Sequence, residues 1–263
     1  MYPLPDYRAG EDSIIDSHAH FNDERYDGFR DEILNKMRQL GVKKIINCGT
    51  DYKRIEECLE LSRKYDFCYT AIAFHPSEIP DNEEIDYDRL YNIIKNERVV
   101  AVGETGLDYY WRQDNKERQK REFVAHIELA KKCGLPIIVH DRDAHADTLE
   151  ILKEYKPSGV VHCFSGSVEM AKEIVKLGMY IGIGGVLTFK NSRVLKEVAK
   201  EIPLDKIVLE TDAPYLSPEP FRGKLNHSAL IIYVARALAE IKGISVDEVL
   251  RVCAQNAENL YNI

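Results

Sequence analysis

Short apolar runs and amphipathic segments alternate along the whole chain. After each apolar run comes a polar loop, and then a stretch whose apolar residues recur with helical spacing. The apolar runs are eight in number and occupy residues 13–20, 43–50, 68–76, 99–108, 135–142, 159–166, 179–185 and 206–214. Strands that alternate with helices predict a parallel sheet, and eight such units in 263 residues favour a closed (β/α)8 barrel over an open sheet.

The segments between the runs have the pattern of amphipathic helices. Clear examples cover 31–41, 118–134, 169–178 and 192–202, and two further helices, 227–243 and 245–263, follow the last apolar run. Several of them end in glycine, which is typical of a helix C-terminus, and Ser245 followed by Glu248 matches a capping box. We therefore expect one α/β domain over residues 1–263, a TIM-type barrel with C-terminal helices.

Composition narrows the setting of this domain. No apolar run approaches the ~20 residues that a membrane span needs, and the first residues lack the basic and apolar regions of a signal peptide. The six cysteines include no C-x-x-C pair, so we expect reduced thiols in a cytoplasmic protein. A net charge of −8 argues against broad, charge-driven binding to duplex DNA, although a metal ion could supply positive charge at a scissile phosphate.

Side chains that bind metals stand at the predicted strand ends, where barrel enzymes place their chemistry. In "IIDSHAHFN", Asp16, His18 and His20 share one side of a strand because side chains alternate. The candidate ligands from all strands are His18, His20, Glu104, His140, His162 and Asp212. Six imidazole and carboxylate ligands are too many for one catalytic ion. They predict two divalent ions (Mg, Mn or Zn) that share a bridging carboxylate and activate a water.

Two carboxylates each precede a predicted ligand by two residues. Metal-binding histidines usually donate their second N–H to such a group, so we expect Asp16 and Glu210 to orient ligands. The other histidines have different contexts. We expect His126 to pack within a helix and His145 to lie on the surface. His75 is either a wall of the site or a substrate contact, or else an ordinary polar residue at a strand end.

Several loops carry groups that suit an oxyanion. The "CFSGS" run offers Ser165 and Gly166, together with backbone N–H groups at a helix start. Arg142 lies two residues after a predicted ligand, and Arg222 and Asn226 lie in the long loop after the last strand. Arginine matches the geometry of phosphate, so we expect these five residues to bind substrate.

Aromatic residues follow Glu104 in the next loop, as Tyr109, Tyr110 and Trp111. Aromatic side chains at the mouth of a site can stack on nucleic-acid bases. They can equally pack a lid, and the sequence does not decide between these interpretations.

At these residues the chain resembles the TatD family of metal-dependent deoxyribonucleases. The matching stretches occur in the family's order: "IIDSHAHFN", "GETGLDYY", "PIIVHDRDAHADTLEIL", "VHCFSGS", "VLETDAPYLSP" and "QNAENLY". The resemblance implies a TIM-type barrel, a two-metal site and hydrolysis of phosphodiester bonds in DNA, commonly from an end. By position, it implies that one ion is held by His18, His20, Glu104 and Asp212, and the other by Glu104, His140 and His162.

The chain departs from the family pattern at two places. The family often reads Asn-Glu-Pro where this chain has Asn226, His227 and Ser228, and it often shows a second histidine where this chain has Ser77. His227 either contacts substrate or begins a helix. Both departures lie in loops that would shape the substrate cleft, so they bear on substrate choice more than on chemistry.

These features favour a divalent-metal-dependent DNA exonuclease acting on single-stranded or frayed ends. Glu104 would bridge the ions and Asp212 would orient or deprotonate the attacking water. One alternative is an amidohydrolase acting on an amide or lactone, although many such barrels bridge their ions with a modified lysine. Another is a metal-binding or partner-binding barrel without catalysis. The native metal, the choice between DNA, RNA and a small phosphodiester, and the oligomeric state stay open.

Overall fold

Eight parallel strands pair in sequence order in the computed structural model, which describes residues 2–6 and 13–263. They are β1 (Ile14–Ala19), β2 (Val42–Gly49), β3 (Cys68–Ile72), β4 (Val99–Asp108), β5 (Ile137–Arg142), β6 (Gly159–Val161), β7 (Tyr180–Ile183) and β8 (Ile207–Leu209). A parallel bridge between Ala19 and Ala213 joins the segment after β8 to β1. The sheet thus closes on itself, and the predicted (β/α)8 barrel is confirmed.

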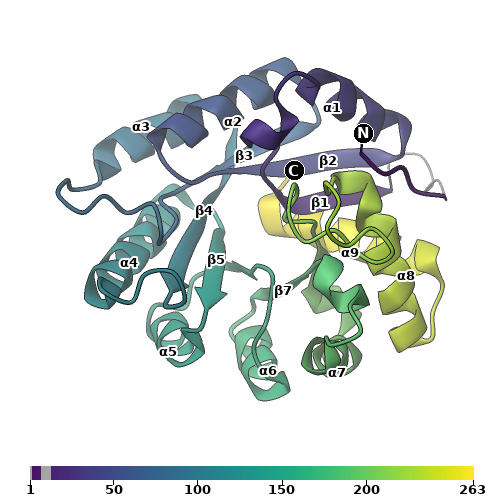
Figure 1. Cartoon of the computed structure of the whole chain (residues 1–263). Helices are drawn as coiled ribbons and strands as arrows, with labels where there is room; N and C mark the ends of the chain where they lie inside the picture. Colours follow the sequence, from purple (N-terminus) through teal and green to yellow (C-terminus); the bar gives the residue numbers. More distant parts are fainter. Residues whose placement is uncertain (1, 7–12) are drawn as a thin grey trace.

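Helices surround the barrel (Figure 1). They are α1 (Arg30–Gln39), α2 (Tyr52–Lys64), α3 (Tyr87–Asn96), α4 (Lys116–Cys133), α5 (His145–Tyr155), α6 (Val168–Lys176), α7 (Arg193–Glu201), α8 (Ile231–Lys242) and α9 (Val246–Tyr261). Each of the six helices predicted by range is present. The largest difference is at the start of α8, where Ser228–Leu230 forms a 3-10 turn first. The hydroxyl of Ser245 accepts the Glu248 N–H at 3.2 Å, as expected for the cap of α9.

The last helix closes the amino-terminal end of the barrel. Tyr261 of α9 packs with Ile15, Ile46 and Ile138, which come from three different strands, and its hydroxyl donates to the carbonyl of Ser17 at 3.0 Å. This apolar plug leaves only the opposite, carboxyl-terminal end of the barrel for a polar site.

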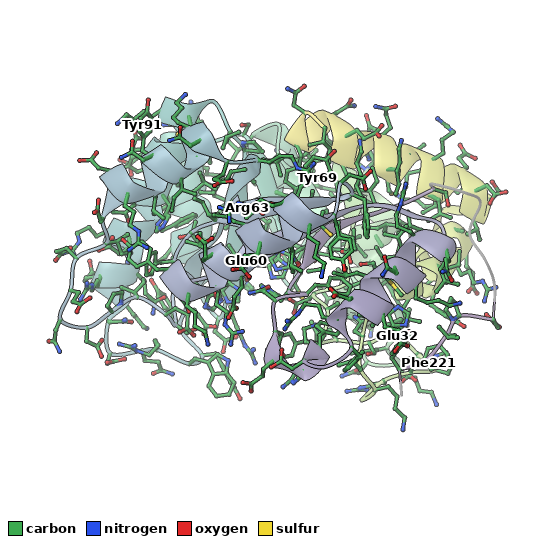
Figure 2. All side chains as sticks on the ribbon, turned by 90° about the horizontal axis from the view of Figure 1, so that it is seen from above. Glu32, Glu60, Arg63, Tyr69, Tyr91 and Phe221 are labelled. Carbon is green, nitrogen blue, oxygen red and sulfur yellow. The ribbon has the colours of Figure 1, made fainter. Side chains whose placement is uncertain are left out.

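Charged side chains cover the outside of the helices. Figure 2 shows Glu32 on α1 and Glu60 and Arg63 on α2, all of them exposed. In residues 2–6 and 13–263, no helix is both long enough and apolar enough to cross a membrane.

Candidate metal centre

A cavity of about 400 Å³ opens at the carboxyl-terminal ends of the strands. Its volume lies within the range of ~300–1,000 Å³ that is typical of ligand sites. Five of the six predicted metal ligands line it, and the sixth, His18, lies buried directly behind them. The structure therefore brings all six side chains to one place.

Glu104 lies at the centre of this cluster and faces histidines on both sides. Its Oε2 is 3.2 Å from Nε2 of His18 and 3.5 Å from Nε2 of His20. Its Oε1 is 2.7 Å from Nδ1 of His140 and 3.0 Å from Nε2 of His162. Each carboxylate oxygen thus faces a different pair of imidazoles, so Glu104 would be shared if divalent ions were held on both sides of it.

The backbone of β4 and β5 is shaped around this carboxylate. The pairing of the two strands shifts register between Val102 and Thr105, next to Glu104. At Gly106, a Cβ atom would overlap the carbonyl oxygen of His140, so glycine is required there for the two strands to approach.

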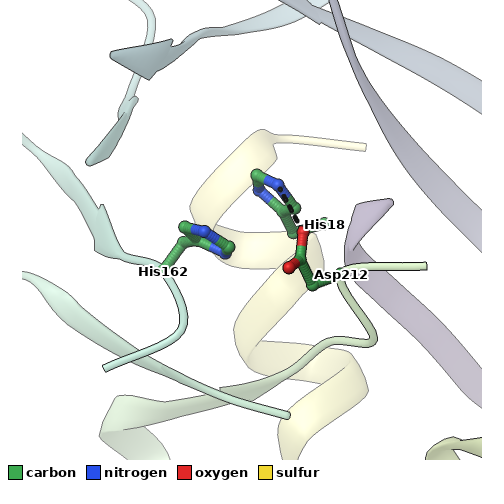
Figure 3. A group of neighbouring side chains, drawn as sticks. All are labelled: His18, His162 and Asp212. Carbon is green, nitrogen blue, oxygen red and sulfur yellow. Dashed lines mark ion pairs between the residues drawn. The ribbon is translucent and has the colours of Figure 1, made fainter. Parts of the chain in front are cut away.

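Asp212 completes the group around His18 and His20. Its Oδ1 lies 3.7 Å from Nε2 of His18 and 3.4 Å from Nε2 of His20, and the rings of His18 and His162 stack at 3.8 Å (Figure 3). The N–H of Asp212 donates to the carbonyl of His18 at 3.0 Å. This backbone bond fixes the loop after β8 against β1.

The donor set fits divalent cations. In the described part of the chain, every ion-pair partner of Glu104 is a histidine, and Nε2 of His18 approaches Nε2 of His20 to 3.0 Å. Burial raises the pKa of Glu104, but the charge of the surrounding imidazoles, foremost His162, holds it well below its usual range. An ionised carboxylate among converging ring nitrogens is the set of groups that a divalent ion requires.

The two histidines of the "HAH" stretch differ in their affinity for a proton. Burial lowers the pKa of His18, and the charge of His162 lowers it further. Burial acts in the same direction on His20, but Asp212 and Glu104 overcome it and raise its pKa to about 10. An ion that binds here would therefore have to displace a proton from His20.

A residue that the sequence analysis missed, Cys48 on β2, orients both of these rings. Nδ1 of His20 lies 3.0 Å from the Cys48 carbonyl oxygen, and Nδ1 of His18 lies 3.4 Å from Cys48 Sγ. Both Nε2 atoms are consequently turned toward the carboxylates. No sequence signal marks a partner that acts partly through its backbone.

Asp108 is a second residue absent from the predicted set. Its Oδ2 lies 3.1 Å from Nε2 of His140, and only 1% of the residue is exposed. A sequence signal was available here, because Asp108 stands four residues after Glu104 on one strand and alternation puts both on one face.

Glu210 lies beside a histidine ring of the cluster, whereas Asp16 is bonded to the segment after β8 and to Ser228. Oε1 of Glu210 lies 3.4 Å from Nδ1 of His162 and accepts the Cys163 N–H at 2.5 Å, so Glu210 does stand behind a predicted ligand. Asp16 instead accepts from the N–H and hydroxyl of Thr211 at 3.0 and 2.6 Å, and from Ser228 at 2.7 Å.

Among the residues that the structure describes, Asp16 therefore contacts no histidine ring, and its expected role in orienting ligands stays a prediction that depends on backbone contacts. The pairing of β1 with β2 shifts between Asp16 and Ala19, which breaks the strict alternation on which that expectation depended. From His18, Asp16 accepts the backbone N–H at 3.3 Å and not a ring nitrogen. Burial raises its pKa to about 7 despite the hydrogen bonds that Thr211, Ser228 and His18 donate to it, so it acts as a buried tie between β1 and the loop that carries Asp212.

We expect Asp16→Ala to destabilise the protein by about 3 kcal/mol, because it leaves the buried donors of Thr211 and Ser228 without an acceptor. Denaturant unfolding followed by circular dichroism measures this loss. Asp66→Ala, at an exposed turn, is the matched control and should change stability by less than about 0.5 kcal/mol. Equal stabilities of the two variants would contradict the structural role of Asp16.

His75 forms part of the cavity wall. Its Nε2 lies 3.7 Å from Glu104 Oε1, while its Nδ1 accepts the Ser77 N–H at 3.1 Å and lies 2.8 Å from the Ser77 hydroxyl. Burial, and next the charge of His140, lowers its pKa to about 3. The ring is thus neutral with its hydrogen on Nε2, directed at the cavity, and Ser77 fixes this orientation.

Of the five residues expected to bind phosphate, all within the described ranges, only Arg142 lines the cavity. Ser165 lines a separate cavity of about 250 Å³ beside β7, and Gly166 is buried where a Cβ would meet Met170 and Phe164. Arg222 is exposed, with its guanidinium 4.4 Å from the ring centre of Phe189. Loop conformation, which the sequence pattern does not specify, sets these positions.

Asn226 is the fourth of the five residues that does not line the cavity. Its Nδ2 donates to the carbonyls of Thr211 and Tyr215 at 2.9 and 2.6 Å, and its Oδ1 accepts the His227 N–H at 2.9 Å. The residue is fully buried, so it holds the loop around Asp212 in place and does not face substrate.

The remaining histidines lie away from the cavity. His227 precedes the 3-10 turn, as one of its two interpretations held, and its Nε2 lies 2.6 Å from the carbonyl oxygen of Pro3. His126 is buried in α4, where its Nε2 accepts the Phe74 N–H at 3.1 Å. His145 lies at the start of α5, with Nδ1 2.7 Å from Asp141.

A closed parallel barrel with four histidines and two carboxylates at its carboxyl-terminal end defines a metal-dependent hydrolase. Residues 15–262 match the family described as TatD related DNase, and the chain belongs to this family, as the sequence motifs indicated.

Relatives and solved structures match the chain over almost its full length. It is 42% identical to "Uncharacterized metal-dependent hydrolase YabD" of Bacillus subtilis, over 95% of this chain and 99% of that one. It is 37% identical to "Uncharacterized metal-dependent hydrolase YcfH" of Escherichia coli, over 95% of this chain and 96% of that one. The crystal structure of YjjV, a TatD homologue from E. coli, superposes with a TM-score of 0.90 at 32% identity, over 96% and 99%.

Proposed function

We propose that the protein is a two-metal phosphodiesterase that removes nucleotides from an end of DNA. The observation that carries this proposal is Glu104, whose two oxygens each face a separate pair of histidines. The family description, TatD related DNase, supports DNA as the substrate. A carboxylate at the bridging position, in place of a modified lysine, favours this reading over an amidohydrolase.

When bound, the two ions would supply Lewis-acid activation of water and stabilise the leaving oxygen. His18, His20, Glu104 and Asp212 would hold one, and Glu104, His140 and His162 the other. Of the two carboxylates among the six candidate ligands, Asp212 is the more open to the cavity, with 21% of its side chain exposed against 5% for Glu104. It is therefore placed to accept the proton of the attacking water. The Nε2–H of His75 and the guanidinium of Arg142 would donate to the phosphate.

The charges around the cavity favour a strand end over the interior of a long duplex. Besides Arg142, Arg54 lines the cavity. Asp23, Asp51 and Glu78 line it as well, and their charge opposes close approach of a long polyanion. A cavity of about 400 Å³ also suits a few nucleotides at most. The enzyme would accordingly engage few phosphates and prefer single-stranded or frayed DNA.

We expect rapid digestion of a linear single strand with manganese, slower digestion of a blunt duplex, and none of a closed circle. The rate at low substrate concentration should fall as salt is added. In a plot of the logarithm of this rate against the logarithm of the salt concentration, the slope should be no steeper than about −2, since each phosphate contact on a single strand contributes about −0.7. Amide and lactone substrates serve as negative controls. Rapid cleavage of the closed circle, or a slope that implies six or more contacts, would rule out the end-directed proposal.

A further inference from the structure

Three side chains form an exposed platform at the rim of the cavity: Tyr110, Trp111 and Arg142. Trp111 is 65% exposed and Tyr110 is 50% exposed, and their rings meet edge to face with centres 4.8 Å apart. The guanidinium of Arg142 lies 4.2 Å from the ring centre of Tyr110 and 5.6 Å from that of Trp111. Large apolar surface that stays open to solvent beside a polar cavity is typical of a binding surface.

The platform is tied to the metal centre by one carboxylate. Oδ1 of Asp108 accepts the backbone N–H groups of Tyr110 and Trp111 at 3.0 and 2.8 Å, while its Oδ2 lies 3.1 Å from Nε2 of His140. Because Asp108 is buried, the platform and His140 are held at a fixed separation. A group that rests on the platform is consequently placed relative to the reacting phosphate.

The loop does not use these rings to close the cavity as a lid. Tyr109, the first aromatic residue of the loop, is the one that packs inward: it is 8% exposed, and its hydroxyl donates to Asp147 at 2.6 Å. Tyr110 and Trp111 instead keep half or more of their surface open to solvent, and Trp111 and Arg142 both line the cavity.

We propose that Tyr110, Trp111 and Arg142 form a stacking subsite for the heterocyclic base of the nucleotide whose phosphate enters the metal centre. This inference rests on the proposed function and adds a base to the features that the site recognises. Every base has a π face, so the subsite accepts all four bases with little sequence preference. The arginine adds a cation that stacks on the same rings and lies within reach of the adjoining phosphate.

Tryptophan fluorescence tests this subsite directly, because Trp111 is the only tryptophan of the chain. The wild-type protein with magnesium is titrated with a tetrathymidylate whose phosphorothioate linkages resist hydrolysis, and with an abasic strand of the same length and charge. The thymidylate should quench the fluorescence and bind about tenfold more tightly than the abasic strand, since stacking contributes about 1–3 kcal/mol per base.

Tyr110→Ala leaves the fluorescent probe in place and should abolish most of that tenfold preference, with less than a twofold effect on the abasic strand. The matched control is Tyr91→Ala. Tyr91 lies on α3 at the outer surface (Figure 2), and the Lys132 amine lies 4.2 Å from the centre of its ring. This control should bind both strands as the wild type does.

Equal affinities of the wild type for the two strands, or no measurable binding of either, would overturn the subsite. So would an unchanged preference in Tyr110→Ala. Hydrolysis of unmodified strands is measured on the same samples, which separates the two proposals. A protein that prefers the thymidylate but cleaves no phosphodiester would support the subsite and refute the proposed function. A protein that cleaves phosphodiesters without this preference would support the proposed function and refute the subsite.

Discussion

Replacing Glu104 with glutamine is expected to reduce phosphodiester hydrolysis at least 1,000-fold, which corresponds to about 4 kcal/mol of activation free energy. Glutamine keeps the volume of the side chain but offers one oxygen in place of two and no charge. The side chain that both pairs of histidines face therefore loses one carboxylate oxygen and its negative charge. Bound metal should fall from two equivalents to one or fewer, measured by elemental analysis of protein saturated with manganese or zinc.

Glu78→Gln is the matched control, because Glu78 lines the same cavity but is exposed. Its Oε1 accepts a hydrogen bond from the Ser77 hydroxyl at 3.1 Å. It should keep two equivalents of metal and most of the activity. Circular dichroism checks that both variants are folded. Residual activity of Glu104→Gln above one tenth of wild type, or two equivalents of metal retained, would contradict the bridging assignment.

Removing metal with a chelator should abolish hydrolysis and lower the melting temperature by about 10 °C. Ions that bind only the native state stabilise it, by about 4 kcal/mol at a free concentration 1,000 times Kd. In a chain of this size, about 1 kcal/mol shifts the melting temperature by roughly 2–4 °C. Calorimetry before and after dialysis, with manganese or zinc added back, measures the effect.

The same treatment of Glu104→Gln distinguishes a specific effect from a general effect of the chelator. With fewer ions to lose, this variant should show a clearly smaller drop in melting temperature than the wild type. An unchanged melting temperature and full activity of the chelated wild type would refute metal dependence.

The barrel and the cluster of ligands were predictable because both follow from regular backbone geometry. Alternating periodicities specify strands and helices, and the carboxyl ends of parallel strands meet at one end of a barrel. Residues within or directly beside strands, such as His18, Glu104 and His140, are therefore brought together whatever the loops do. Asp108 obeys the same rule and could have been found by it.

Residues whose positions depend on loops or irregular pairing were not predictable in this way. The register shift in β1 sends Asp16 toward Thr211, and the turn geometry after β8 buries Asn226 among backbone carbonyls. Ser165 belongs to a loop that turns toward β7. In each case the residue type was suited to the predicted role, but its direction was set by local backbone structure that has no periodic signature.

The contact between Asp16 and Thr211 joins residues 195 positions apart, and Asp212 follows directly. During synthesis, His18 and His20 leave the ribosome long before Asp212 exists. A growing chain therefore holds an incomplete ligand set until Asp212, at position 212 of 263, has been made. The six side chains can therefore hold metal together only late in synthesis or afterwards, so the ions that the surrounding compartment then offers influence which metal they hold. Protein produced in different growth media can differ in metal content while having the same sequence and fold.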